Sequence, residues 1–187
     1  GAWTEEEFNY QGEFFQYEGV RLTPKPYQQP RPPIWIGAFA PKAMTRALDY
    51  EGWCTWFPPP LEALAPAVRE MRERAEAKGK SDFQVTLGFE GWIGDAPDLR
   101  EKHGHRWVRE WSFYVEKGLS PDAEAKDMLD EIESSFLCIG NRQKWIDRMG
   151  EMKEKVNPDS ICLRTRNPVN PGQYYPSGTE CLEVIEA

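Results

Sequence analysis

A regular alternation of short apolar runs and helical patterns begins at Pro33, and it limits the possible folds more than any other feature. The expected strands are IWIG, GWCTWF, QVTLGFE and SICLRT, at residues 34–37, 52–57, 84–90 and 160–165. Helical patterns directly follow the first two strands, at 41–50 and 61–80. Strand and helix in turn, with short connections, are typical of a parallel sheet with right-handed crossovers, so the sequence predicts an α/β fold.

Further elements are expected on both sides of this alternation. Helices are predicted at about 98–117 and 121–133, and Asn141 is placed to cap a third, RQKWIDRMGEMKEK. At the other end, FNYQGEFFQYEGVRLT (8–23) predicts a small β-hairpin, because aromatic and polar residues alternate around turn signals. The prolines of PKPYQQPRPP then predict an extended surface connector, although their Pro-x-x-Pro spacing also fits an SH3-type ligand.

The two faces of the expected strands differ in polarity, which helps to choose among α/β folds. In QVTLGFE every second residue is apolar, whereas Glu90 lies on the polar face. In ICLRTR the polar face carries Arg164 and Arg166. A doubly wound sheet would have continuously apolar strands, because helices cover both of its faces. A β/α barrel fits better, with helices over the apolar face and the charged residues at the carboxyl strand ends, where barrel active sites are built.

Composition and charge argue against several classes of function. The net charge of -8 argues against a nucleic-acid or anionic-membrane partner. No apolar run reaches the roughly 18 residues of a membrane helix, and the N-terminus has no signal-peptide core, so we expect a soluble, cytoplasmic protein. The cysteines are widely spaced and are expected to be free thiols: Cys54, Cys138, Cys162 and Cys181.

No metal site is predicted from the sequence. The cysteines have no histidine near them at zinc-ligand spacing. His103 and His105 stand two residues apart on an expected helix, so they point to different faces. We interpret both histidines as surface or interface residues.

Four stretches occur in an order that is typical of one known family. They are GEFFQYEGVRLTPKPYQQPRPPIWIGAFAPKAMTRAL, EGW, FLCIGNRQKWIDRM, and ICLRT before an Asn-Pro pair. With these stretches the chain resembles the bacterial luciferase-like flavin monooxygenases, a family that includes F420-dependent oxidoreductases. The resemblance implies the C-terminal half, about strands 5–8, of a luciferase-like (β/α)8 TIM barrel, preceded by the small hairpin. Residues 1–187 would then form one half-barrel domain, with hairpin and leader at 1–32, β/α units at 33–166 and an irregular tail with a short helix at 167–187.

The resemblance also implies a cofactor site at the turn after the first barrel strand of this chain. In relatives, backbone N–H groups at the following helix N-terminus hold a flavin phosphate, and the matching positions here are Gly37, Ala38, Phe39 and Ala40, with Lys42 adding charge. Alternatively, Gly37 simply permits a tight strand-to-helix turn. The implied cofactor is reduced FMN, or else F420, used by an oxidoreductase, a monooxygenase, to oxidise a small organic substrate.

Charged residues and a tryptophan complete the candidate site. Glu90 is a candidate proton donor or acceptor, and Arg164 or Arg166 is a candidate for holding an anionic substrate. A structural Glu–Arg pair closing the top of the barrel explains these residues equally well. Trp56 either flanks an isoalloxazine ring or fills space in the barrel.

A second class of function is open at this point, namely a non-catalytic, truncated half-barrel that self-associates or pairs with another chain. Four strands taken from an eight-stranded barrel leave unpaired edges at IWIG and SICLRT. We therefore expect a homo-oligomer with an interface well above roughly 1,000 Å². A third possibility is that this sequence is a fragment of a longer natural chain.

Overall fold

The computed structural model describes residues 1–95, 98–116 and 128–165. The chain divides into two compact units, Gly1–Ile34 and the part from Trp35 onward. Among the helices of these described ranges, none is long and apolar enough to cross a membrane.

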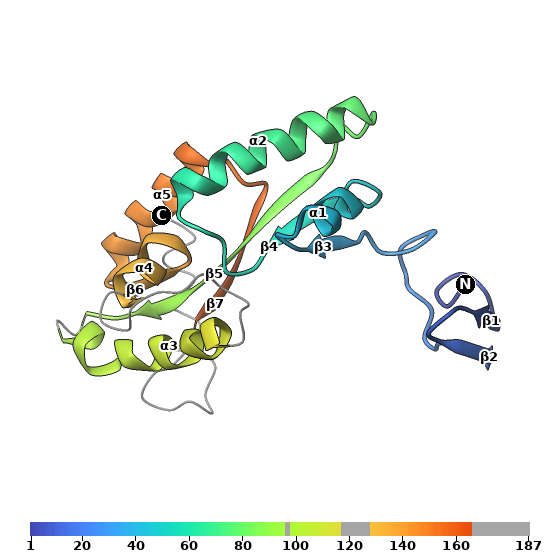
Figure 1. Cartoon of the computed structure of the whole chain (residues 1–187), viewed down its shortest axis with the longest axis horizontal. Coiled ribbons are helices and arrows are strands. Elements are labelled where there is room, and N and C mark those ends of the chain that lie inside the picture. The colour runs from blue at the N-terminus through green and yellow to red at the C-terminus, as the bar shows by residue number, and fades with distance from the viewer. Residues whose placement is uncertain (96–97, 117–127, 166–187) are drawn as a thin grey trace. The chain divides into compact units, whose positions relative to one another are not determined.

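The first unit is a β-hairpin followed by the proline-rich connector (Figure 1). Strand β1 (Phe8–Gln11) pairs antiparallel with β2 (Gln16–Val20), and the register shifts between Phe8 and Tyr10. The Asn9 side chain accepts a hydrogen bond of 2.7 Å from the Gly19 amide at this irregularity. The predicted hairpin is confirmed, and residues 21–34 contain neither helix nor strand.

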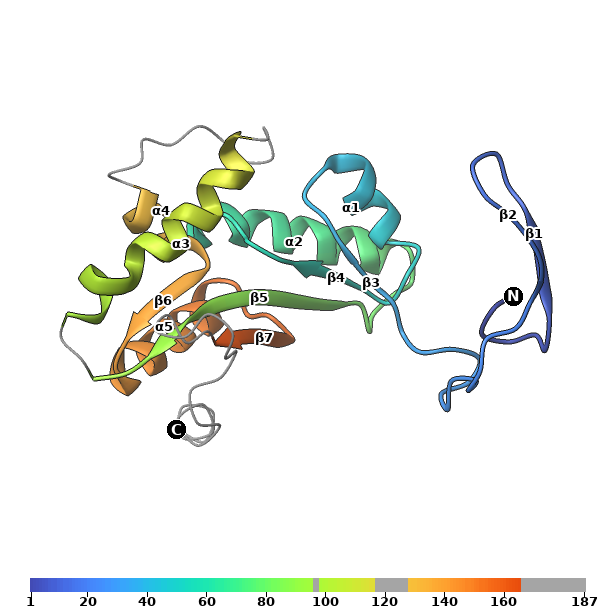
Figure 2. The same cartoon turned by 90° about the horizontal axis from the view of Figure 1, so that it is seen from below.

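The second unit is a parallel sheet with helices packed against it. Its strands are β3 (Trp35–Gly37), β4 (Gly52–Thr55), β5 (Gln84–Ile93), β6 (Leu137–Gly140) and β7 (Ser160–Thr165). Its helices are α1 (Pro41–Ala47), α2 (Leu61–Ala77), α3 (Leu99–Glu116), α4 (Met128–Ser135) and α5 (Arg142–Lys155). Strands β3, β4 and β5 pair in sequence order. Residues 86 and 87 of β5 pair with both β4 and β7, so these two strands lie on opposite sides of β5 (Figure 2).

The hydrophobic core covers the apolar face of β5. The alternating apolar side chains of this strand are all buried: Val85, Leu87 and Phe89. Trp145 of α5 is fully buried and packs edge-on against Phe89, with the ring centroids 5.8 Å apart. Helix α2 adds buried residues at helical spacing to the same cluster: Leu61, Leu64, Val68 and Met71. The predicted burial of this strand face is confirmed.

Several element boundaries differ from the predicted ones for local backbone reasons. Strand β4 ends at Thr55 instead of residue 57, because Phe57 has a left-handed φ of 57° and three prolines follow it. Strand β5 continues to Ile93 because its last residues pair with β6. The predicted cap is confirmed, since the Asn141 side chain accepts a hydrogen bond of 3.0 Å from the Lys144 amide.

Strand β6 is an element that the alternation did not predict. Its four residues pair in parallel with Glu90–Ile93 of β5. The available signal was the apolar run Phe136–Ile139 before Gly140, which the sequence alone assigned only to the approach to a helix. The helix predicted at 121–133 is observed at Met128–Ser135, and residues 117–127 lie outside the described part of the chain, as does the predicted tail.

The junction of β5 and β6 depends on a glycine. A Cβ on Gly91 would overlap the Cys138 carbonyl oxygen and would lie 2.6 Å from the Trp145 ring. The Trp145 Nε1 donates a hydrogen bond of 3.1 Å to the Trp92 carbonyl, which holds α5 against the same place. The two strands can therefore approach this closely only if residue 91 has no side chain.

We predict that Gly91→Ala lowers the free energy of unfolding by about 1–3 kcal/mol, the usual cost of overpacking a filled site. The matched control is Gly150→Ala in α5, where a Cβ meets nothing within 4 Å among the described residues. The control should gain about 0.5–1 kcal/mol, because alanine favours a helix over glycine. Urea denaturation followed by circular dichroism measures both, and equal stability of Gly91→Ala and the parent would contradict the packing described.

Candidate functional site

The carboxyl ends of the parallel strands bring most of the predicted site residues to one edge of the sheet. The β3–α1 turn follows β3, and Trp56 follows the end of β4. Glu90 and Arg164 lie at paired positions of β5 and β7. Arg166 lies outside the described residues. This edge is where barrel enzymes build their active sites.

A buried tryptophan holds the β3–α1 turn in place. The Trp53 Nε1 donates a hydrogen bond of 2.6 Å to the Ala38 carbonyl. Its ring also contacts Phe39 edge-on, with centroids 6.0 Å apart. Helix α1 then begins at Pro41 with no acidic residue in its first turn, and the Lys42 side chain is exposed. The turn thus presents a fixed helix N-terminus without a competing negative charge.

The space beside the Cα of Gly37 is not filled by other described residues. Among the described residues, a Cβ at this position would meet only the Cys54 carbonyl oxygen, at an ordinary contact distance of 3.8 Å. The φ of Gly37 also lies outside the left-handed region. Neither space nor conformation therefore requires a glycine for the turn itself, which removes the main support for the tight-turn interpretation.

Glu90 and Arg164 form an ion pair between β5 and β7. The Glu90 side chain is only 3% exposed, whereas that of Arg164 is 30% exposed. The Arg164 guanidinium lies over the rings of Trp56 and Phe57, with its central carbon 5.2 Å and 5.9 Å from the two centroids. The predicted proximity of Glu90 to one of the two arginines is confirmed for Arg164.

The Trp56 indole lies next to Gly88 of β5 and beside this ion pair. A Cβ on Gly88 would overlap the indole, so the ring occupies the space above that glycine. Contact with the strand backbone and with Arg164 fixes the ring in position. A place for Trp56 beside an isoalloxazine ring stays a prediction.

Phe57 is a site residue that the sequence did not reveal as such. Its ring lies 4.8 Å from that of Phe136 and 5.4 Å from that of Trp111, between β4 and helix α3. Its left-handed φ costs on the order of 1–3 kcal/mol, a strain often found at functional sites. The available signal was WFPPP at a carboxyl strand end, where prolines force the chain to turn.

Two thiols near the sheet are poorly suited to nucleophilic chemistry. Burial raises the pKa of Cys54, and nearby Cys162 raises it further. Burial raises the pKa of Cys138 to about 12. Cys54 and Cys138 therefore stay protonated at neutral pH, and the thiolate is the reactive form. Cys54, Cys138 and Cys162 are free cysteines, and Cys181 lies outside the described part of the chain. Of the two histidines, His105 is exposed, and the side chain of His103 lies outside the described part.

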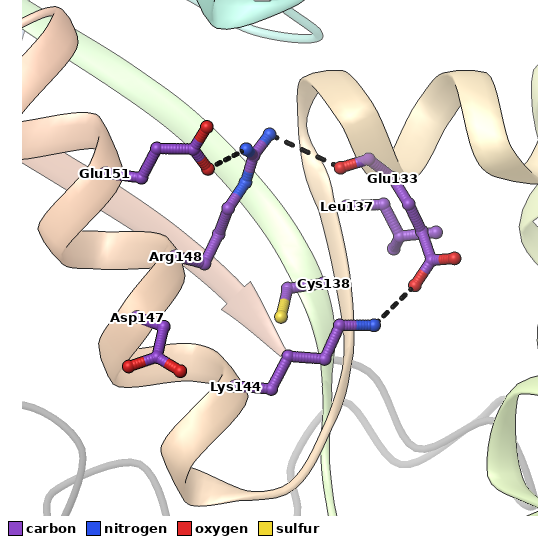
Figure 3. A pocket seen from close by; sticks show the side chains of 7 residues that line it. All are labelled: Glu133, Leu137, Cys138, Lys144, Asp147, Arg148 and Glu151. Atoms are coloured by element: carbon purple, nitrogen blue, oxygen red, sulfur yellow. Dashed lines mark hydrogen bonds and ion pairs between the residues drawn. The ribbon is translucent and has the colours of Figure 1, made fainter.

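A cleft of about 420 Å³ lies between α4, β6 and α5 (Figure 3). Its lining residues are Glu133, Leu137, Cys138, Lys144, Asp147, Arg148 and Glu151. The charges in it bind one another: Lys144 donates to the Glu133 carboxylate at 3.0 Å, and Arg148 donates to that of Glu151 at 2.5 Å. Arg148 also donates to the backbone carbonyls of residues 133–135 at the end of α4. The Lys144–Glu133 ion pair and the Arg148 hydrogen bonds join α4 and α5 across the cleft, whose lining includes none of the predicted site residues.

Comparison with known proteins identifies the family. The sequence pattern of the luciferase-like monooxygenases matches residues 1–156. The chain belongs to the luciferase-like monooxygenase family. It is 30% identical over 93 residues to the FMNH₂-dependent dimethylsulfone monooxygenase of Pseudomonas putida, a match that covers 50% of this chain and 25% of that protein.

Solved structures of this family share the fold of the chain. An F420-dependent secondary alcohol dehydrogenase, in complex with an F420-acetone adduct, superposes with a TM-score of 0.64 at 18% identity, over 87% of this chain and 52% of that one. The EDTA monooxygenase of Chelativorans sp. BNC1 superposes with a TM-score of 0.63 at 16% identity, over 94% and 48%. The chain thus spans about half the length of these relatives, which is consistent with the predicted half of a luciferase-like barrel.

We predict that Arg164→Leu lowers the free energy of unfolding by about 3–5 kcal/mol, because it leaves the Glu90 carboxylate buried without its cation. The double variant Glu90→Gln, Arg164→Leu should recover part of this loss, since no uncompensated charge remains. Denaturant titration of the parent, both single variants and the double variant gives the coupling free energy. Strictly additive effects would contradict a direct Glu90–Arg164 interaction.

Proposed function

We propose that this chain forms the C-terminal, flavin-binding half of a luciferase-like oxidoreductase barrel that oxidises a small organic substrate. Family membership supports the reaction class. The observation that carries the proposal is the β3–α1 turn, which combines an open backbone at Gly37 with a fixed helix N-terminus. Such a turn is suited to an anion such as the phosphate of a flavin nucleotide.

The residues of this turn fit a phosphate group. The backbone amides of Phe39 and Ala40 precede the helix, and the Lys42 ammonium is exposed nearby. Ala38 contributes through its position, since its carbonyl already accepts the Trp53 indole hydrogen bond. Reduced FMN is the first choice of cofactor, because the matched dimethylsulfone monooxygenase depends on it, and F420 is the alternative.

The remaining candidate residues would position the substrate and exclude water. A reduced flavin held there would supply the electrons that activate dioxygen, and the activated oxygen would oxidise the substrate. Glu90 is the candidate for holding or moving a proton, and its ion pair with Arg164 orients the carboxylate. Arg164 is already engaged by Glu90, so Arg166 is the better candidate for an anionic substrate group. The rings of Trp56 and Phe57 contact the Arg164 guanidinium and cover part of it.

A second candidate function is a half-barrel that acts only when another barrel half is supplied. Within the described residues, β3 pairs only with β4, and β7 pairs only with β5. Unpaired strand edges bind further strands readily, because their backbone N–H and C=O groups lack partners. We propose that residues 1–187 alone associate through these edges into a homo-oligomer, and that a longer polypeptide would close the barrel on itself.

For the phosphate site we predict that Ala38→Asp abolishes FMN binding, because a carboxylate then faces the phosphate, and that Lys42→Ala weakens binding several-fold. The control is Ala63→Asp, an exposed position in the first turns of α2. Quenching of flavin fluorescence during titration measures all four proteins, and parallel titrations with F420 decide between the two cofactors. If Ala38→Asp bound FMN with the affinity of the parent, the proposed phosphate site at this turn would be wrong.

For the strand edges we predict that residues 1–187 sediment at micromolar concentration with at least twice the 21.6 kDa of one chain. The physical reason is that closure of the sheet would pair the outer edges of β3 and β7, which pair with no further strand among the described residues. A compact monomer that unfolds cooperatively would contradict association through the edges, whereas flavin binding by that monomer would leave the phosphate site intact.

A further inference from the structure

The backbone at Phe57 has a conformation that its local sequence disfavours. Its φ is 57°, in the left-handed region, although Phe57 is bulky and Pro58 follows it. A residue before proline normally has an extended backbone. Such an outlier persists only where the surrounding structure fixes it, and outliers of this kind cluster at functional sites. The contacts of the Phe57 ring indicate what this conformation does.

The Phe57 ring contacts both the helical segment between β5 and β6 and the charged pair of the candidate site. Its centroid lies 4.8 Å from that of Phe136, directly after α4, and 5.4 Å from that of Trp111 in α3. The rings of Phe136 and Trp111 also contact each other, with centroids 5.0 Å apart. The central carbon of the Arg164 guanidinium lies 5.9 Å from the Phe57 centroid. One side chain therefore connects α3 and the end of α4 with β7.

A second path connects the same groups through Glu90. The Glu90 amide donates a hydrogen bond of 2.8 Å to the Phe136 carbonyl. Its carboxylate, which is almost fully buried, forms the ion pair with Arg164. Phe57 contacts both of these partners of Glu90. The four residues form a closed set of contacts, so a displacement of the Phe57 ring changes the surroundings of the ion pair.

We propose that Phe57 is a positioning residue, which holds the Arg164 guanidinium against the Glu90 carboxylate and makes this ion pair depend on the packing of α3. An arginine side chain has many rotamers, and an aromatic face beside its planar guanidinium selects among them. Trp111 in turn supports the Phe57 ring from α3. The inference rests on the proposed function in one respect, the proton-handling role of Glu90. Orientation of that carboxylate would set the direction in which it takes or gives a proton.

A set of mutant cycles on residues 1–187 tests the positioning separately from general stability. Each cycle compares Glu90→Gln, Arg164→Leu, the double variant and their common background by urea denaturation, which gives the coupling between the two charged residues. The backgrounds are the parent, Phe57→Leu, Phe57→Tyr and Trp111→Leu. The matched control background is Phe83→Leu, which makes the same change at a buried phenylalanine just before the amino end of β5.

Phe57→Leu should lower the coupling constant of the ion pair about fivefold or more, because an aliphatic side chain lacks the face that orients the guanidinium. Phe57→Tyr should keep the parent coupling, since it keeps the ring, and Trp111→Leu should lower the coupling in the same direction as Phe57→Leu. Phe83→Leu should lower the stability of the chain and leave the coupling unchanged. Undiminished coupling in Phe57→Leu, or an equal loss in Phe83→Leu, would overturn the positioning role. Undiminished coupling in Trp111→Leu would overturn the dependence on α3.

Proton exchange at the Arg164 Nε, followed by NMR, is a second measurement that needs only folded protein. Its signal is the one that is missing from the spectrum of Arg164→Leu. Exchange should be about tenfold faster or more in Phe57→Leu and Trp111→Leu than in the parent and Phe57→Tyr, because a released guanidinium is open to water. Equal rates in these four proteins would contradict the proposal. Neither measurement contains flavin, so FMN titration of the same proteins tests the proposed function separately.

Discussion

Backbone pairing along both sides of β5 is the interaction on which the second unit depends. One side of this strand pairs first with β4 and then with β6, and the other side pairs with β7. Its apolar residues face the helices, while Glu90 faces the candidate site. A shift of one residue in its register would exchange the two faces, so the same ladder that builds the core also places the functional groups.

The glycines of β5 allow large groups to come close to this ladder. Gly88 leaves room for the Trp56 indole, and Gly91 leaves room for the carbonyl of Cys138 on β6. The indole in turn lies under the Arg164 guanidinium, which pairs with Glu90. Because this pair is nearly neutral as a whole, the anionic part of a bound nucleotide would depend on the β3–α1 turn under the proposed function. Under this proposal the Glu90–Arg164 ion pair and the phosphate-binding turn are two separate charged places at the carboxyl ends of the strands.

The two units differ in how much of their apolar surface they bury within themselves. The sheet of the second unit covers one face with its own helices, and Trp145 of α5 packs against Phe89 and donates a hydrogen bond to the Trp92 carbonyl of β5. The hairpin has a comparably apolar face but no second layer within residues 1–34. Local ion pairs and the Asn9–Gly19 hydrogen bond keep it in shape, yet they bury little apolar surface.

Local residue patterns were enough to predict several elements of this fold from the sequence alone. Alternation along QVTLGFE identified the buried face, Asn141 identified a helix start, and the prolines before Ile34 ruled out helix and central strand. Each of these signals acts over a few neighbouring residues, so it can be read directly. Only the tertiary structure decided that LCIG is a strand, that Phe57 takes a left-handed conformation, and that residue 91 must lack a side chain. These outcomes depend on contacts between segments far apart in the chain, such as Gly91 with Cys138, and no local pattern encodes such a contact.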